Sequence, residues 1–221
     1  MKLNADFSVP AWAVLDELPW QPSPDGSVER RMLDRIGDEV ARATTVVRYP
    51  PDSHFPAHRH DLGEEFLVLE GVFSDEHGDY PAGTYVRNPP GTSHSPFSKP
   101  GCILFVKLRQ FARDDLRQFS VDTRAAAWSG TGAGASWLAL HQHGDEVVSM
   151  ARLEAGAALA DDTWPGGAEI LVLEGGIEDG ERRYPENSWL RLPPGSRRRL
   201  SSETGALCYL KQGHLSPAVD Q

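Results

Sequence analysis

Cysteine and long apolar runs are both scarce in this chain. The 221 residues include two cysteines, Cys102 and Cys208, which is too few for a disulfide framework and fits a reducing compartment. No apolar run reaches the roughly 18 residues of a membrane-spanning helix, and the N-terminus lacks the basic and apolar segments of a signal peptide. We therefore expect a soluble, cytoplasmic protein with no membrane partner.

Basic residues are in deficit as well. The 22 Lys and Arg residues stand against 32 Asp and Glu residues, which gives a formal net charge of −10 at pH 7. Because nucleic acids are bound largely through phosphate contacts with a basic surface, we expect no direct nucleic-acid partner.

Helical periodicity is also rare, whereas short apolar runs separated by glycine and proline are frequent. The chain holds 21 glycines and 17 prolines. Stretches rich in β-branched and aromatic residues predict strands at residues 44–49, 65–69, 84–87 and 102–108. Regularly spaced short strands with turn signals between them are typical of an all-β barrel or jelly roll.

The sequence repeats with an offset of 104 residues. Four landmarks recur: residues 66–71 with 170–175, 80–81 with 184–185, 89–91 with 193–195, and Lys107 with Lys211. A constant offset over separated landmarks indicates two copies of one unit. We predict an extended N-terminal arm at residues 1–25, which packs across a barrel or a partner subunit, a first barrel at residues 26–122 and a second barrel at residues 123–221.

Residues of metal-binding types gather in two stretches of the first copy. His58 and His60 are two residues apart, so a strand presents both side chains on one face. Glu64 joins them if residues 61–63 turn into the next strand, and His94 follows a second turn that is rich in proline and glycine. Neutral imidazoles and a carboxylate suit one divalent ion, for which zinc, iron, manganese and nickel are candidates.

This spacing resembles the two cupin motifs. The pattern HxHxxxE with a glycine after six further residues covers residues 58–71, and GxxxxxPxG with a histidine three residues later covers residues 83–94. The sequence around both motifs resembles that of the ChrR-type cupins, and the resemblance covers roughly residues 20–215. The resemblance implies a bicupin, that is, two tandem cupin barrels of the double-stranded β-helix type. It also selects Glu64, rather than the adjacent Glu65, as the ligand.

The same resemblance implies a regulatory function. In ChrR-type proteins a cupin-like domain forms the C-terminal, zinc-binding sensor half of an anti-sigma factor. It therefore implies one Zn²⁺ per chain, with Fe²⁺, Mn²⁺ and Ni²⁺ as alternatives, and a stress-sensing protein whose partner is a sigma factor or another regulatory protein. It further implies a homodimer. Those proteins also carry an N-terminal helical zinc domain, for which this chain has no cysteine before Cys102 and no room ahead of Trp20.

The second copy has lost the ligand types. The positions of His58, His60, Glu64 and His94 are taken by Asp162, Trp164, Ala168 and Arg198, respectively. A lone carboxylate does not make a transition-metal site. We expect the second barrel to bind no metal, with Trp164 and Arg198 in the space of the ion.

An enzymatic function is the alternative hypothesis. Three histidines and one glutamate around Fe²⁺ leave one or two coordination positions open, where a small diketone or phenolic ketone can react with dioxygen. Tyr85, Phe97 and Phe105 are candidate wall residues, although core packing explains them equally well. The sequence identifies no general base apart from the ligands, so no catalytic residue is assigned. An open pocket beside the ion would favour catalysis, whereas a closed tetrahedral site would favour sensing.

Overall fold

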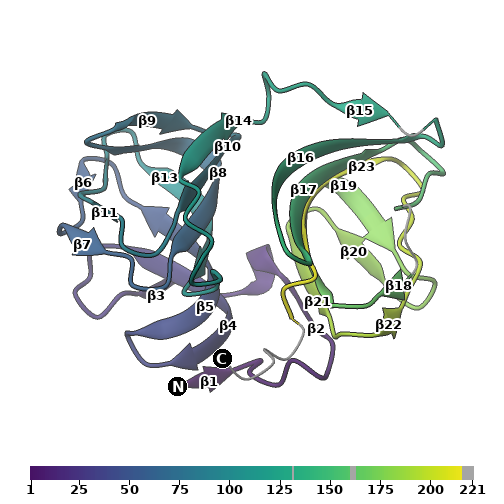
Figure 1. Ribbon diagram of the computed structural model, residues 1–221, viewed down its shortest axis with the longest axis horizontal. Helices are drawn as coiled ribbons and strands as arrows, with labels where there is room; N and C mark the ends of the chain where they lie inside the picture. Colours follow the sequence, from purple (N-terminus) through teal and green to yellow (C-terminus); the bar gives the residue numbers. More distant parts are fainter. Residues whose placement is uncertain (131, 160–162, 216–221) are drawn as a thin grey trace. The chain divides into compact units, whose positions relative to one another are not determined.

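The computed structural model describes residues 1–130, 132–159 and 163–215, and strands make up almost all of its regular structure (Figure 1). The short 3-10 helix η1 (Leu15–Glu17) is the one helical element in the described ranges. The all-β prediction is therefore confirmed. No helix in these ranges has the length and apolar character that a membrane crossing requires.

The chain divides into two compact units. Unit 1 comprises Met1–Ala5 and Pro19–Ala126, and unit 2 comprises Asp6–Leu18 and Ala127–Gln221. The cysteines are free and buried, one in each unit. Burial raises the pKa of Cys102 to about 11 and that of Cys208 to about 12, so both thiols stay protonated at neutral pH.

Unit 1 is built on one antiparallel sheet and a smaller one. Along the main sheet the order is β1 (Lys2–Leu3), β4 (Glu29–Gly37), β5 (Ala41–Tyr49), β13 (Cys102–Leu108), β8 (Glu64–Asp75), β10 (Thr84–Asn88) and β14 (Phe119–Asp122). Four short strands pair at its sides: β3 (Gln21–Pro22), β6 (Ser53–His54), β9 (Gly78–Pro81) and β12 (Phe97–Ser98). The separate small sheet consists of β7 (His58–Arg59) and β11 (Ser93–His94).

The interior of unit 1 follows strand alternation. Even-numbered residues of β8 and β13 point inward, and Phe66, Val68, Leu104 and Val106 are among the buried members of one apolar cluster. Each such side chain stabilises the fold by about 1.5–3 kcal/mol on burial. Gly71 lets β8 pass close to β13, because a Cβ at this position would lie 2.0 Å from the carbonyl oxygen of Gly101. The motif glycine is therefore a packing requirement.

Unit 2 repeats this plan. Its main sheet runs in the order β15 (Ser129–Gly130), β16 (Ala135–His143), β17 (Glu146–Leu153), β23 (Ala206–Gln212), β19 (Ala168–Glu178), β21 (Ser188–Leu192) and β2 (Ala11–Val14). Strand β20 (Arg183–Pro185) pairs with β19, and β18 (Thr163–Trp164) pairs with β22 (Ser196–Arg197).

The strand that precedes each copy in the sequence completes the sheet of the other copy. Strand β2 precedes the first copy, yet it pairs with β21 in unit 2, where Ala13 stands opposite Trp189. Strand β14 precedes the second copy, yet it pairs with β10 in unit 1, where Val121 stands opposite Tyr85. Strands β10 and β21 are equivalent under the repeat offset, so the exchange is reciprocal. The residues predicted as one arm thus contribute β1 and β3 to unit 1 and β2 to unit 2.

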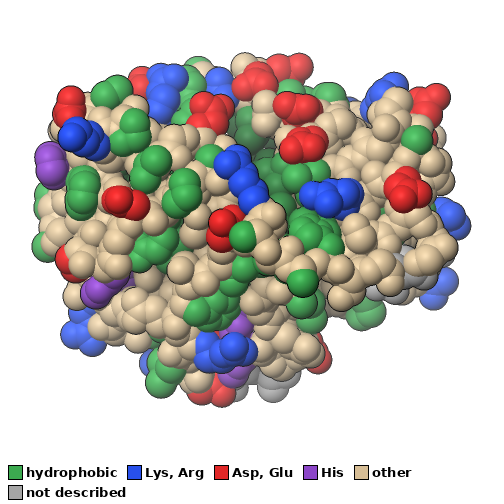
Figure 2. Space-filling model, turned by 90° about the horizontal axis from the view of Figure 1, so that it is seen from above, with side chains coloured by type: hydrophobic (Ala, Val, Ile, Leu, Met, Phe, Trp, Pro, Cys, Tyr) green, Lys and Arg blue, Asp and Glu red, His purple; other side chains and the backbone are tan. Residues whose placement is uncertain are grey.

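The surface carries charges of both signs. On the face shown in Figure 2, acidic and basic side chains are interspersed with apolar ones among the described residues.

Candidate metal centre

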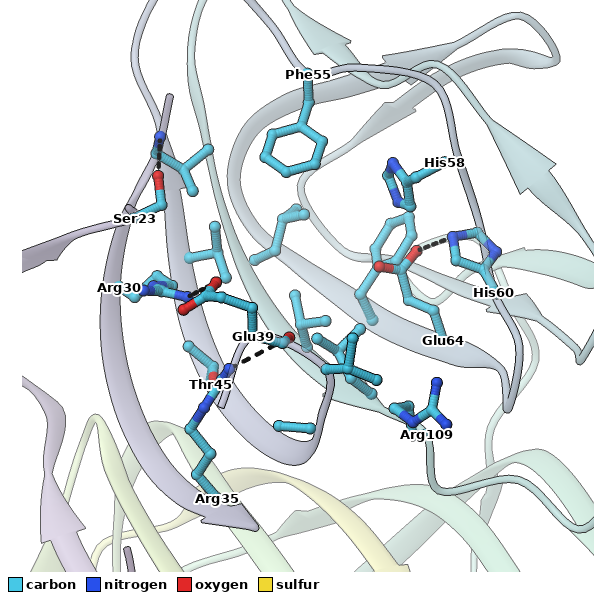
Figure 3. A pocket seen from close by; sticks show the side chains of 18 of the residues that line it. Ser23, Arg30, Arg35, Glu39, Thr45, Phe55, His58, His60, Glu64 and Arg109 are labelled. Atoms are coloured by element: carbon cyan, nitrogen blue, oxygen red, sulfur yellow. Dashed lines mark hydrogen bonds and ion pairs between the residues drawn. The ribbon is translucent and has the colours of Figure 1, made fainter. Parts of the chain in front are cut away.

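The structure brings the predicted ligands of unit 1 together. His58 on β7 and His94 on β11 are directly paired residues of the small sheet. His60 follows β7 and is 6% exposed, and Glu64 is the first residue of β8. One ligand atom from each of the four side chains lies within 4.8 Å of the others. Figure 3 shows His58, His60 and Glu64 facing one another across a short gap.

Residues 61–63 form the turn that places Glu64 in this cluster, which is the condition that the spacing of the ligands set. Gly63 has a φ of +78°, a left-handed conformation that favours glycine. A Cβ at this position would also lie 2.4 Å from the ring of Phe111. Glycine is therefore needed here for both backbone and packing reasons.

The Nδ1 atom of each of the three histidine rings lies within hydrogen-bond distance of an oxygen atom of the protein. His58 Nδ1 donates to the carbonyl of Pro56 at 2.9 Å. His60 Nδ1 lies 3.0 Å from Thr92 Oγ1, which accepts because the Thr92 hydroxyl donates to the carbonyl of Pro89. His94 Nδ1 lies 3.2 Å from Asp75 Oδ2. With Nδ1 as the donor in all three rings, each Nε2 presents a lone pair to the common centre.

The spacing of these groups fits a divalent ion. Glu64 Oε2 lies 3.4 Å from His60 Nε2 and 3.5 Å from His94 Nε2. Ligands that bind one ion at about 2.1 Å and at 90–110° to each other stand about 3.0–3.4 Å apart. The His60 Nε2 atom is buried and has no hydrogen-bond partner in the described part of the chain. An unsatisfied buried nitrogen of this kind is what a metal ion would engage.

Burial and the local charges shift the pKa values of these groups. Burial lowers the pKa of His60 and outweighs the nearby Glu64 carboxylate, so the neutral, metal-binding form is favoured. Burial also acts to lower the pKa of His94, but the hydrogen bond to Asp75 and the Glu64 charge raise it overall. Asp75 is 7% exposed. Asp75 was not among the predicted site residues, although an aspartate recurs at the equivalent position of the second copy, Asp179, under the offset of 104 residues.

Glu65 lies on the opposite face of β8 from Glu64. Its carboxylate accepts hydrogen bonds from the Tyr85 hydroxyl at 2.5 Å and from the Arg87 guanidinium at 3.0 Å. The choice of Glu64 for the cluster agrees with this register. Of the two readings that the sequence left open for Tyr85, Phe97 and Phe105, the wall of the cavity is not borne out, since none of them lines the cavity beside the ligands. Tyr85 and Phe105 are buried on the face of their strands that lies away from the cavity, because they occupy odd-numbered positions.

A cavity of about 510 Å³ opens beside the ligands within unit 1. Its apolar wall includes Tyr49, Phe55, Phe66, Phe73, Leu104 and Val106. Its polar lining includes His58, His60 and Glu64 on one side and Arg30, Arg35 and Glu39 on the other (Figure 3). A concave, largely apolar space with a few convergent polar groups is the usual form of a small-molecule site.

The matching position in unit 2 is filled by protein side chains. Trp164 is 2% exposed, and its indole N–H donates to the carbonyl of Arg198 at 3.0 Å. The Arg198 guanidinium donates to Asp179, the repeat equivalent of Asp75. A guanidinium has thus replaced the histidine beside the retained carboxylate. Asp162 lies outside the described residues, and the expectation that unit 2 binds no metal stays a prediction.

Comparisons with known proteins give the family and the fold. A family model for the ChrR cupin-like domain matches the chain twice, at residues 10–112 and 116–216. A search of curated protein sequences gives no significant match.

Several solved structures share the fold of the whole chain. A protein from Nostoc punctiforme that is proposed to be a dioxygenase is 15% identical, with 96% of this chain and 85% of that chain covered and a TM-score of 0.76. The bacterial pirin YhhW in complex with nickel(II), from Escherichia coli, is 15% identical, with 95% and 100% covered and a TM-score of 0.69. An oxalate decarboxylase from Bacillus subtilis is 12% identical, with 94% and 78% covered and a TM-score of 0.63. At these identities the likeness shows the fold alone, which is that of two tandem cupin barrels.

Proposed function

The chain belongs to the family of ChrR cupin-like domains, with two such domains in tandem, and from the cavity beside the ligands we propose that its first barrel is a metal-dependent enzyme site. In this proposal the three histidines and Glu64 hold one divalent ion, and the site oxidises a small diketone or phenolic ketone with dioxygen. The family membership agrees with the resemblance that the two motifs carried.

The cavity beside the ligands is the observation that carries this proposal. A structural ion has a closed coordination shell, whereas a catalytic ion needs an open position with room for a substrate. The space of about 510 Å³ adjoins His58, His60 and Glu64 and is large enough for a small organic molecule. This open arrangement favours the enzymatic hypothesis over the regulatory one.

Fe²⁺, when bound, supplies a Lewis acid and a binding site for dioxygen. Cleavage of a diketone by dioxygen needs no external reductant, because the breaking carbon–carbon bond supplies the electrons and both oxygen atoms enter the products.

The chain's own residues bind the substrate and exclude water. Tyr49, Phe66 and Phe73 form an apolar wall that limits solvent around the reacting groups. Burial raises the pKa of Tyr49 far above its ordinary value, so its hydroxyl stays protonated and does not act as a base. Asp75 and Thr92 position two of the imidazole rings from behind.

A regulatory function is the second candidate, and the family match favours it. If the barrel is a sensor, the ion holds one conformation, a chemical signal alters it, and a protein partner such as a sigma factor reads the change. The cavity would then bind the signal molecule.

Metal analysis and oxygen consumption separate the two candidates. We expect the protein purified without added metal to hold one ion per chain, and the iron-loaded form to consume oxygen with a small diketone or a phenolic ketone. A His60→Ala variant from which metal has been removed with a chelator serves as the metal-free control. The purified protein could instead hold one equivalent of zinc, and the iron-loaded form could consume no oxygen with any of a panel of small diketones and phenolic ketones. That result would reject the oxygenase and leave the sensor.

A further inference from the structure

Two arginines line the cavity on the side away from the metal ligands. Arg30 and Arg35 both belong to β4, and both are lining residues. Figure 3 places them across the cavity from His58 and Glu64. Neither is needed by the proposed reaction, since the ion and its ligands would supply that chemistry. Their place in a largely apolar cavity calls for a separate explanation.

The guanidinium groups converge on the turn after β4. Arg35 is 4% exposed, and one of its terminal nitrogens donates to the backbone carbonyls of Asp38 and Glu39. Arg30 Nη1 lies 3.5 Å from Glu39 Oε2, and the Glu39 side chain is 63% exposed. The buried Arg30 Nε has no hydrogen-bond partner among the described residues. Arg30, a lining residue of the cavity, thus has donor capacity that its protein partners do not use.

The acidic groups near this end are already engaged. Asp38 pairs with the N-terminal ammonium group of Met1. Asp25, another lining residue, accepts hydrogen bonds from Ser23 and from Ser27. Burial lowers the pKa of Arg35 and the positive charge of Arg30 lowers it further, which together outweigh the raising effect of Glu39 and Asp38, so the two cations are close enough to repel. An anion between them would relieve this repulsion.

Strand register fixes the distance between the arginines and the ligands. Arg35 stands opposite Ala43, Ala43 opposite Leu108, and Leu108 opposite Glu64. Three strand spacings of about 4.8 Å therefore separate Arg35 from Glu64, or about 14 Å along the sheet. Because the sheet is curved, the path across the interior is shorter. The wall between them is apolar, with Val47, Leu104 and Val106 at its centre.

We propose that the cavity binds an amphipathic carboxylic acid, with its carboxylate at Arg30 and Arg35, its apolar body against the sheet and its reactive end at the metal ligands. The identity of the reactive end rests on the proposed function, whereas the acid-binding end is independent of it. A space of about 510 Å³ also exceeds what a small diketone alone would fill. The substrate would then be a keto acid with a chain or ring between its two functional ends.

Two probes of equal size test the acid-binding end. We would measure by calorimetry the binding of 5-phenylpentanoate and of its uncharged amide, 5-phenylpentanamide, to the zinc-loaded protein. A charge-assisted hydrogen bond strengthens binding by roughly tenfold or more, so we expect that preference for the acid. Arg30→Gln and Arg35→Gln should each reduce the preference to about threefold or less. Arg48→Gln is the matched control, because Arg48 pairs with Glu29 and does not line the cavity.

The His60→Ala variant, from which metal has been removed with a chelator, separates this inference from the proposed function. If the preference for the acid persists there, the carboxylate is bound by the arginines, and a failure of oxygen uptake would then reject only the oxygenase. If the preference disappears in His60→Ala, the carboxylate binds the metal and the inference is overturned. Equal affinity for the acid and the amide in the unaltered protein, or an undiminished preference in both arginine variants, would overturn it as well. The comparison of the two probes in the unaltered protein requires no variant to fold.

Discussion

At the scale of single residues, the candidate centre depends on groups that never touch the ion. Asp75 accepts a hydrogen bond from His94, and its other carboxylate oxygen accepts from the His77 backbone N–H and the Tyr80 hydroxyl. A carboxylate behind a histidine fixes the ring and increases its basicity as a ligand. We therefore expect Asp75 to be a second determinant of metal affinity, alongside the predicted ligands.

Replacing Asp75 with Asn should weaken metal binding without removing it. The amide keeps the shape but loses the negative charge, and such changes typically reduce metal affinity by about 10–100-fold. Competition with a chromogenic chelator would measure the zinc affinity. Asp61→Asn is the control, because Asp61 is close in sequence but its side chain is 68% exposed. Equal zinc affinities for the two variants would contradict the role assigned to Asp75.

Asp179 in unit 2 should make stability depend on pH. Burial acts to raise the pKa of this carboxyl, but hydrogen bonds from Arg198, from two backbone N–H groups and from Tyr184 lower it overall, below the ordinary 3.8. A depressed folded-state pKa gives stability that is present above the unfolded value and is lost as the pH falls through the folded value. Urea unfolding between pH 2 and 6, a range of about four units around that value, should show this loss.

The Asp179→Asn variant provides the comparison. It should be less stable than the unaltered protein at pH 6 or so, and its stability should fall less steeply below the ordinary carboxyl pKa of 3.8. Parallel pH profiles for the two proteins would show that Asp179 does not carry the effect.

At the scale of elements, the turn between β7 and β8 sets the geometry of the ligands. Gly63→Ala would place a side chain in a left-handed conformation, at a backbone cost of about 1–2 kcal/mol, and would push against Phe111. We expect a lower unfolding midpoint and weaker metal binding, because Glu64 is the next residue. Gly26→Ala is a matched control, since Gly26 has a φ of +73° but a Cβ added there would have nothing within 4 Å. If Gly63→Ala binds zinc as well as Gly26→Ala does, the turn does not control the site.

Strand β2 is expected to stabilise unit 2, although it lies near the start of the chain. The Leu15 N–H donates to the carbonyl of Asn187 at 2.8 Å, and the period of two places the Ala13 N–H toward β21 as well. Ala13→Pro removes that donor, at a cost of about 1–3 kcal/mol, whereas Ala13→Val keeps it. Hydrogen exchange of β21 should increase in the proline variant alone. Unchanged protection in the proline variant would mean that the pairing contributes little.

Local patterns predicted more than long-range pairings did. The ligand spacing at His58 and His60, the turn before Glu64 and the repeat were readable because each depends on neighbouring residues or on a constant offset. The sequence left open whether Tyr85 and Phe105 line the cavity or pack in the core, because their face depends on the register across several strands. The positions of Arg30 and Arg35 in the cavity were not foreseen for the same reason. Nothing local in residues 11–14 indicates a partner strand in the second copy.

At the scale of the whole molecule, the two units share one plan but differ in their centres. The shared parts are those that build the barrel, such as the paired carboxylates Asp75 and Asp179 with their tyrosines. The parts that differ are the ligand positions, where unit 2 has Trp164 and Arg198. Duplication has therefore left one barrel with a buried histidine cluster and the other with a packed indole and an internal ion pair.

This asymmetry predicts that metal removal destabilises only one of the units. Binding of an ion to the folded state at a concentration of 1,000 times its dissociation constant adds about 4 kcal/mol of stability, and all four predicted ligands lie in unit 1. A chelator should therefore lower the temperature of one unfolding transition and leave that of a second unchanged. Scanning calorimetry with and without the chelator would measure both transitions. The His94→Arg variant has at this position the residue type that unit 2 has at Arg198. In this variant the chelator should have no effect on either transition. An equal shift of every transition would instead mean that unit 2 also binds the ion or unfolds together with unit 1.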